Sequence, residues 1–217
     1  MPRLLSLFDG TGSITKHFRE AGWEIQSLDI DGRFGATVQE DILLWDYSAE
    51  PVPDVIFSGT PCEQYSQART TGGPRNYALA DALASKQWEI IKHFLDRSPT
   101  TIYFIENPAY SQLWKRECAR EFATPHAICD YCAYGAPYRK RTRFANNCTT
   151  WVPRELCNPR NCVGCPNGKS HARTAQKGPC RGTNSADRFS TDQLHAYPEP
   201  LCREIFEHCQ GALWEMV

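Results

Sequence analysis

The first 150 residues repeat one pattern, in which an apolar run of strand length ends in a polar turn and a helical segment follows. Leu4–Phe8 and Thr101–Ile105 are two such runs, and Ala78–Arg97 carries an apolar stripe at helical spacing. Strands that alternate with helices bury their apolar faces most simply as a mostly parallel sheet with helices on both faces. We therefore predict an α/β fold of this kind for residues 1–150.

Acidic residues follow the predicted strands in chain order. The turn after the first strand, Asp9–Ser13, has glycines that let a ligand approach the backbone, and the helix behind it favours negative charge. Asp29 follows the second strand, Glu24–Leu28, and Asp41 lies near the end of a third segment. Ligands of open α/β sheets bind at these carboxyl ends. The pattern indicates a nucleoside-containing cofactor, with Asp29 on the ribose and Asp41 on the adenine amino group.

Cys62 stands in a stiff turn at the end of another short apolar strand. Pro61 fixes its own φ and biases Thr60 toward extended geometry, so the thiol is held in place. Most cysteines outside disulfides are small buried hydrophobes. A cysteine that follows Gly-x-Pro in a polar turn at a strand end is instead a candidate nucleophile.

In this context the chain resembles the DNA cytosine-C5 methyltransferases, in particular their compact phage- or virus-type members. Matching motifs run in family order from Arg3 to Ile205, nearly the whole chain. The motifs are Phe8-Asp9-Gly10-Thr11-Gly12, Ser58-Gly59-Thr60-Pro61-Cys62, Ile105-Glu106-Asn107, Tyr134-Gly135-Ala136-Pro137 with Lys140, Arg141 and Arg143, and Ala196-Tyr197-Pro198-Glu199-Pro200-Leu201.

The resemblance implies a Rossmann-like sheet and S-adenosylmethionine-dependent methylation of cytosine C5 in double-stranded DNA. The thiolate of Cys62 would attack C6 of a flipped-out cytosine, with Glu106 holding N3 and Asn107 fixing the loop. The first and second motifs and the acidic strand ends would bind the cofactor. The implied cofactor residues are Phe8, Asp9, Gly10, Thr11, Gly12, Asp29, Ile30, Asp41, Ile42, Ser58 and Pro61.

The arginine motif departs from the family pattern, because the usual preceding glutamine is replaced. An alignment without gaps puts Lys140 and Thr142 opposite the family's two arginines. A shift of one residue puts Arg141 and Arg143 there instead, and apolar Phe144 then starts the next strand. We prefer the shifted alignment. It assigns contact with the base carbonyl, and lowering of the thiol pKa, to Arg143 or Arg141.

Residues 151–188 lose all periodicity and are rich in Cys, Pro, Gly, Asn and basic side chains. A segment so small and irregular cannot bury enough apolar surface to order itself. Cys157, Cys162, Cys165 and His171 have the ligand types and tight spacing of a structural zinc site. Other cysteines are weaker candidates: Cys148, Cys180, and the pair Cys129 and Cys132, which we expect to be buried thiols on a strand.

The sequence thus divides into three predicted parts. Residues 1–150 form the S-adenosylmethionine-binding catalytic domain, 151–188 a small target-recognition segment, and 189–217 a segment that packs back on the catalytic domain. Such a short segment predicts a short or loose recognition sequence. Its side chains available to phosphates and base edges are Arg154, Arg160, Lys169, Arg173, Gln176, Lys177 and Arg181.

Overall composition gives no basic signature for nucleic acid. The net charge is −1, with a sequence pI of about 6.6, so DNA contact would rely on local patches such as Arg139–Arg143. No segment approaches transmembrane length, and the N-terminal segment is a predicted strand rather than a signal peptide. The 11 cysteines then indicate a nucleophile plus metal ligands in a reduced, intracellular protein with no membrane partner.

Other functions stay open from the residues alone. Asn107-Pro108-Ala109-Tyr110 resembles the Asn-Pro-Pro-Tyr motif of adenine-N6 and cytosine-N4 methyltransferases, whose chemistry needs no cysteine. That motif ends the fourth strand in those enzymes, whereas here the fourth predicted strand ends in Thr60-Pro61-Cys62, which favours the C5 reading. A tRNA-acting C5 methyltransferase and a catalytically inactive, zinc-bearing nucleic-acid-binding protein are the further alternatives.

Overall fold

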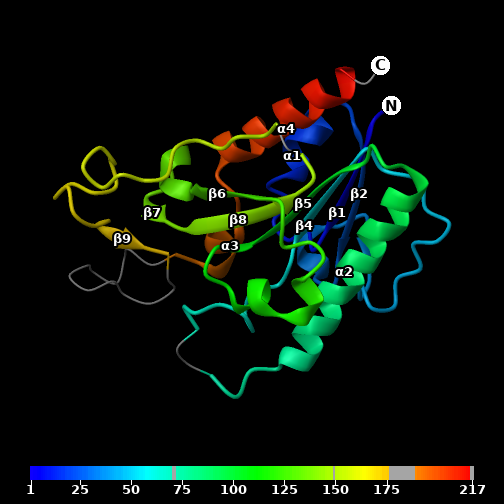
Figure 1. The fold of residues 1–217 in the computed structure, drawn as a ribbon, viewed down its shortest axis with the longest axis horizontal. Coiled ribbons are helices and arrows are strands. Elements are labelled where there is room, and N and C mark those ends of the chain that lie inside the picture. The colour runs from blue at the N-terminus through cyan, green and yellow to red at the C-terminus, as the bar shows by residue number, and fades with distance from the viewer. Residues whose placement is uncertain (70–71, 149, 176–188, 216–217) are drawn as a thin grey trace.

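The computed structural model describes residues 1–217 except 70–71, 149, 176–188 and 216–217. Within the described residues lies a seven-stranded sheet with strand order β3-β2-β1-β4-β5-β8-β6 (Figure 1). The first five strands in that order are parallel, and β8 is antiparallel to both β5 and β6. The strands are β1 Arg3–Leu7, β2 Glu24–Asp29, β3 Val38–Gln39, β4 Val55–Gly59, β5 Ile102–Pro108, β6 His126–Asp130 and β8 Arg141–Asn146.

Helices cover both faces of this sheet. The α-helices are α1 Thr15–Glu20, α2 Tyr77–Arg97, α3 Thr191–His195 and α4 Glu199–Trp214. Short 3₁₀ helices are η1 Gly32–Phe34, η2 Gln112–Lys115, η3 Glu117–Ala119 and η4 Tyr131–Tyr134. Among the described residues, no helix has both the length and the apolar character needed to cross a membrane.

Two hydrophobic cores form because successive strand residues point to opposite faces. Leu4 and Phe57 face the core under α1 and α4, where the rings of Phe18 and Phe206 meet edge to face at 5.1 Å. Leu5 belongs to the other core, under α2. Each fully buried side chain of this size contributes about 1.5–3 kcal/mol. Figure 1 shows α1 beside α4 and α2 across the sheet, so the predicted α/β class with helices on both faces is confirmed.

The order of the strands reverses between β1 and β4. From β1 the chain builds β2 and β3 on one side, then returns to place β4 and β5 on the other. The connections therefore diverge at the carboxyl ends of β1 and β4 and leave a crevice there, which is where open α/β sheets bind ligands.

The Cys-rich segment projects from this sheet. Between residues 151 and 175, all of which are described, the only regular element is β9, Arg173–Thr174. It pairs in parallel with β7, Tyr138–Arg139, and Figure 1 shows this part of the chain extending to one side of the sheet. The irregular character predicted for residues 151–188 is confirmed over residues 151–175, and the rest of that segment lies outside the described residues.

Candidate active site

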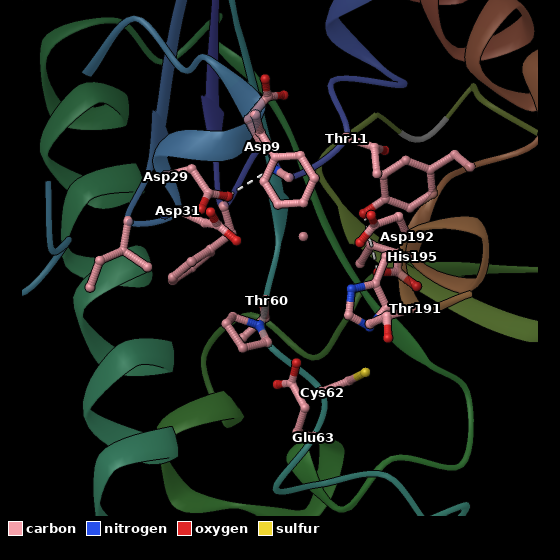
Figure 2. A pocket seen from close by; sticks show the side chains of 18 of the residues that line it. Asp9, Thr11, Asp29, Asp31, Thr60, Cys62, Glu63, Thr191, Asp192 and His195 are labelled. Atoms are coloured by element: carbon pink, nitrogen blue, oxygen red, sulfur yellow. Dashed lines mark hydrogen bonds between the residues drawn. The ribbon is translucent and has the colours of Figure 1, made fainter. Parts of the chain in front are cut away.

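A cavity of about 340 Å³ lies at the carboxyl ends of β1, β2, β4 and β5 (Figure 2). In that view Asp29 and Asp31 lie at one end of it and Cys62 at the other. The cavity therefore joins the predicted cofactor residues to the predicted nucleophile. The predicted site residues on its wall are Phe8, Asp9, Gly10, Thr11, Asp29, Ile30, Pro61, Cys62 and Glu106.

The turn after β1 has a backbone that favours glycine. Phe8, Gly10 and Gly12 all have positive φ, at 56°, 52° and 66°, and glycine adopts this region without strain. The carboxylate of Asp29 accepts the N–H of Gly10 and the N–H of Asp31, both at 2.8 Å. Asp29 thus joins the turns after β1 and β2 and keeps further lone pairs for a ligand.

Asp9 places a half-buried carboxyl on the cavity wall. Burial raises its pKa to about 6, although the Ser6 hydroxyl donates to it at 2.7 Å and opposes the shift. A positively charged ligand in the cavity would lower that pKa again and stabilise the carboxylate. This wall therefore suits a cationic group such as a sulfonium.

The Cys62 loop is fixed from two directions. The Thr60 hydroxyl donates to Gln87 Oε1 on α2 at 2.7 Å, and the Asn107 amide donates to the Thr60 carbonyl at 2.8 Å. Three residues after Cys62, the ring of Tyr65 is fully buried. Gln87 was not anticipated from the sequence, where it is one polar residue within an otherwise ordinary amphipathic helix. It holds the loop rigid so that the thiol faces the cavity.

The thiol of Cys62 is mostly protonated at neutral pH in this state. Burial raises its pKa to about 11, and the charges of Glu106 and Glu63 raise it further, while the ammonium of Lys140 lowers it. The thiolate is the reactive form. A positive charge or a proton acceptor that arrives with the substrate is therefore needed to convert the thiol to the thiolate.

Glu106, at the end of β5, is a buried carboxyl with one unsatisfied oxygen. It is 6% exposed, and its Oε2 accepts the hydroxyl of Tyr197 at 3.2 Å. Its Oε1 has no hydrogen-bond partner among the described residues, and the ammonium of Lys140 lies 3.9 Å away. Burial raises the pKa of Glu106. A protonated carboxyl facing a cavity can donate a hydrogen bond to a ligand.

Lys140 is the basic side chain beside the Cys62 end of the cavity. Its ammonium donates to the Leu194 carbonyl at 3.1 Å and lies 4.9 Å from the centre of the Tyr131 ring. With Glu106 at 3.9 Å, it forms a pair that is largely shielded from solvent. This is the residue that the gap-free alignment sets opposite a family arginine.

Arg141 and Arg143, which the shifted alignment favoured, do not line the cavity. Arg141 pairs with the fully buried carboxylate of Asp130 at 2.9 and 2.7 Å. Arg143 donates to the Ala123 carbonyl and lies 4.5 Å from the centre of the Trp114 ring. The physical reason is the pleat, because a shift of one residue moves a strand side chain to the opposite face.

Some other predicted positions also lie off the wall. Ile42 and Ser58 are buried in the sheet core, at 3% and 0% exposure. β3 is only two residues long and ends at Gln39, so Asp41 lies beyond it and accepts the N–H of Leu43 at 3.0 Å. Gly12 belongs to the turn but is not part of the wall. The contact of Asp41 with adenine stays a prediction.

Residues 191–197, which precede α4 near the C-terminus, form another part of the cavity wall. The N–H of Tyr197 donates to Ser13 Oγ at 3.1 Å, and its hydroxyl reaches Glu106. A Cβ on Gly59 would lie 2.7 Å from that hydroxyl, so any other residue at this strand end would displace the Tyr197 side chain. Thr191, Asp192 and His195 complete the wall. The sequence marked the motif around Tyr197 but assigned this side chain no role.

A second group of reactive side chains lies in the Cys-rich segment. Ligand atoms of Cys132, Cys157, Cys162 and His171 all fall within 4.8 Å of one another. Three of these were predicted, but Cys132 sits half-buried on η4 rather than buried on a strand. Cys165 is not in the mutual set. Of the weaker candidates, Cys148 lies 3.1 Å from His208 Nε2, and Cys180 falls outside the described residues, as do Gln176, Lys177 and Arg181.

Known proteins similar to this chain include a viral one. A probable DNA (cytosine-5)-methyltransferase of Frog virus 3 (isolate Goorha) is 30% identical over 184 residues, and the match covers 76% of this chain and 78% of the viral protein. No family model matches the chain.

Two solved structures show a looser likeness. The S. pombe Dnmt2 methyltransferase superposes with a TM-score of 0.46 at 15% identity, covering 74% of this chain and 60% of that one. A mutant of Spodoptera frugiperda DNMT2 gives 0.39 at 13% identity, covering 73% of this chain and 54% of that one. The chain thus spans less than two thirds of either solved structure.

Proposed function

This chain belongs to the DNA (cytosine-5)-methyltransferase family, and we propose that it methylates C5 of cytosine in double-stranded DNA with S-adenosylmethionine as the methyl donor. The observation that carries the proposal is the meeting of Cys62 and Glu106 at one cavity. A nucleophile lies there with a buried carboxyl whose Oε1 lacks a partner, which suits a pyrimidine edge.

The other end of the cavity fits the cofactor. S-adenosylmethionine would supply an electrophilic methyl group on a sulfonium. Gly10 allows close approach of the ligand to the backbone, Asp29 has lone pairs left for ribose hydroxyls, and Asp9 offers a carboxylate to the positive charge. Exposed Ile30, on the same wall, offers an apolar surface to the adenine.

The residues divide the chemistry as follows. Cys62 loses its proton to solvent and its sulfur bonds to C6, which makes C5 electron-rich enough to take a methyl group. The bond between that methyl group and the sulfonium sulfur breaks, and the donor leaves as a neutral thioether. Glu106 in its protonated form donates to N3 and offsets the charge that develops on the ring. Loss of the C5 proton to solvent, with cleavage of the sulfur–C6 bond, then releases the product and returns Cys62 as a thiolate. Because these groups lie inside a cavity, the cytosine must leave the duplex to reach them.

Lys140 takes the role that the shifted alignment gave to an arginine. Its ammonium lowers the pKa of the Cys62 thiol and lies close enough to Glu106 for both groups to contact one edge of a base. Lys140→Met should lower the methylation rate by about 10²-fold, the usual effect of removing one aimed electrostatic group. The matched control is Arg139→Met, an exposed neighbour off the cavity wall. Equal losses in the two variants would assign the effect to surface charge.

Asp29 is expected to support the cofactor by joining two turns. Asp29→Ala removes the acceptor of the Gly10 and Asp31 N–H groups, and should weaken S-adenosylmethionine binding by roughly 1–3 kcal/mol. Calorimetry with the cofactor alone measures this. Asp31→Ala is the comparison, because the Asp31 carboxylate lies on the same wall but is partly exposed and paired with Arg33. A larger loss in Asp31→Ala would move the ribose contact to that residue.

The amino-methyltransferase reading fits the geometry less well. The Asn107 amide donates to the Thr60 carbonyl, and the Tyr110 side chain is 64% exposed and off the cavity wall. Neither is therefore arranged around a target amino group, whereas Cys62 faces the cavity. The decisive experiment offers the protein labelled S-adenosylmethionine with duplex DNA or tRNA. 5-Methylcytosine in DNA supports the proposal, while N4-methylcytosine, N6-methyladenine or label in tRNA alone would replace it.

DNA contact is proposed for the Cys-rich segment. Arg160 and Lys169 are exposed there, whereas Arg154 is already engaged with Glu204 at 3.4 Å and with the Tyr134 ring. Exposed basic side chains contact phosphates without reading sequence. No two of the described cysteines form a disulfide.

A further inference from the structure

Three thiols and one imidazole from two separate parts of the chain meet at one point. Cys157 Sγ lies 3.7 Å and Cys162 Sγ 3.4 Å from the same nitrogen, Nε2 of His171. Cys132, from η4, joins them, and all four ligand atoms fall within 4.8 Å of one another. Reduced thiols that merely fill a core do not need to converge on one ring nitrogen.

Two of the ligand–ligand distances match edges of a zinc tetrahedron, and all of them fall within 4.8 Å. Zn–S bonds of about 2.3 Å and Zn–N bonds of about 2.0 Å put two ligand atoms about 3.5 Å apart for sulfur and nitrogen, and about 3.8 Å apart for two sulfurs. The two sulfur–nitrogen distances in the structure, 3.7 and 3.4 Å, lie close to this value. Four protein ligands leave no open position, as in structural zinc sites.

Two further contacts hold the histidine in the orientation that this site needs. Cys165 Sγ lies 3.2 Å from Nδ1, the other ring nitrogen, where it can accept that N–H and leave Nε2 free to bind a metal. Gly164 lies under the ring, and a Cβ there would be 2.9 Å from His171 Cδ2. Cys165 is therefore a partner of the ligand rather than a ligand itself.

We propose that Cys132, Cys157, Cys162 and His171 bind one structural zinc ion. This ion would link the Cys-rich segment to the hairpin of β6 and β8, whose connecting residues include η4 and Lys140. Cys132 is next to Tyr131, whose N–H donates to the Lys140 carbonyl at 3.1 Å. The Tyr131 ring also lies 4.9 Å from the Lys140 ammonium. The zinc site stands independently of the proposed methyl transfer, and only its effect on Lys140 depends on that function.

Other contacts also join the Cys-rich segment to the residues around this hairpin. The N–H of Cys157 donates to Asp130 Oδ2 at 2.9 Å, and β9 pairs with β7 just before Lys140. Trp151 packs on Phe104 and Phe144 at the start of the segment, but farther along its described part the apolar side chains of Val152, Leu156 and Val163 are exposed. A metal that crosslinks η4 to the segment would supply the missing constraint.

Elemental analysis of the full chain tests the site without reference to catalysis. The wild type should contain about one zinc per chain, the content of a single four-ligand site. Cys132→Ala should lose it, whereas Cys118→Ala, a half-buried thiol on η3 away from the cluster, should keep it. Cys165→Ala should still bind one zinc, with affinity for added Zn²⁺ weakened about 10- to 100-fold, as when the hydrogen-bond partner of a ligand is lost.

Two results would overturn the assignment. If Cys132→Ala retains zinc with unchanged affinity while Cys165→Ala loses it, the ligands are Cys157, Cys162, Cys165 and His171, and nothing crosslinks η4. If the wild type binds no zinc as purified or after addition of Zn²⁺, the cluster is a group of reduced thiols.

Hydrogen exchange tests the link to the active site. Removal of zinc with a chelator should speed exchange of the peptides that contain Tyr131 and β7, and leave the peptide that contains β1 unchanged. Since the Tyr131 amide is bonded to Lys140, its protection reports whether the hairpin is held. If zinc removal speeds exchange only within residues 151–175, the metal orders that segment alone and the proposed link to the hairpin is wrong.

Discussion

Replacing Cys62 with serine should lower methyl transfer by at least about 10³-fold, the scale on which loss of a nucleophile acts in covalent catalysis. The hydroxyl is a far weaker nucleophile toward C6 than a thiolate. Cofactor binding should persist, because the cofactor end of the cavity, at Asp29, is remote from Cys62 (Figure 2). Radiolabelled methyl transfer and calorimetry with S-adenosylmethionine measure the two quantities.

DNA that contains 5-fluorocytosine supplies a second measurement of the same step. Fluorine at C5 cannot leave as a proton does, so the wild type should stay covalently joined to the DNA and migrate as a conjugate in denaturing gels. Cys62→Ser should form no conjugate. Full activity in Cys62→Ser would end the C5 mechanism and restore the amino-methyltransferase reading at Asn107-Pro108-Ala109-Tyr110.

The pH dependence of Cys62 follows from its surroundings. With a pKa of about 11 in the ligand-free protein, only a small fraction of the thiol is ionised at neutral pH. Its alkylation by iodoacetamide should therefore keep accelerating as the pH rises well above 9. Lys140→Met should raise the thiol pKa further and slow this reaction at any given pH, because the ammonium lowers that pKa.

Glu106→Gln should lower the methylation rate by about 10²- to 10⁴-fold, the range for a positioned proton donor. Glutamine keeps the shape and can still accept the Tyr197 hydroxyl, but it cannot carry a proton to N3 and give it up again. The expected result is a fall in kcat with little change in S-adenosylmethionine affinity. Glu117→Gln offers a control, since Glu117 is an exposed carboxylate of η3 off the cavity wall.

The stability of Glu106→Gln separates a catalytic role from a structural one. Burial raises the pKa of Glu106 above its value in the unfolded chain. The folded state therefore binds more protons than the unfolded chain. The stabilisation that this protonation gives is fully present below the pKa of Glu106 in the unfolded chain, and it is lost as the pH rises through the pKa of Glu106 in the folded protein. Glutamine never ionises. Thermal unfolding of Glu106→Gln at pH 8 should therefore occur no lower than in the wild type, and a large drop in Tm would assign the residue a structural role.

Much of this site could be predicted from the sequence, because it lies at strand ends. Asp29, Cys62 and Glu106 each follow an apolar run of strand length. Parallel strands bring all their carboxyl ends to one edge of a sheet, so residues far apart in the chain must meet there. Once the alternation of strands and helices was recognised, neither the crevice nor its main residues required knowledge of the packing.

Which cation faces the crevice was decided only by the tertiary structure. Lys140, Arg141 and Arg143 are neighbours in sequence, and both alignments were acceptable. Pairing of β8 with β5 and β6 sets one register, and in it Lys140 lies on the cavity wall while Arg141 bonds to Asp130 and Arg143 lies against Trp114. A shift of one residue in the register moves every side chain of the strand to the opposite face of the sheet. Packing between strands, rather than the local sequence, fixes that register.

The cysteine cluster follows the same physical division. Close spacing in the chain identified Cys157, Cys162 and His171, because residues within one short irregular segment are forced to stay near one another. It could not distinguish Cys165 from Cys132, since the latter comes from η4 and reaches the group only when the segment docks beside β7. The local sequence determined which residues lie at the carboxyl edge of the sheet and which types of side chain are present. Long-range packing decided which of these side chains come into contact.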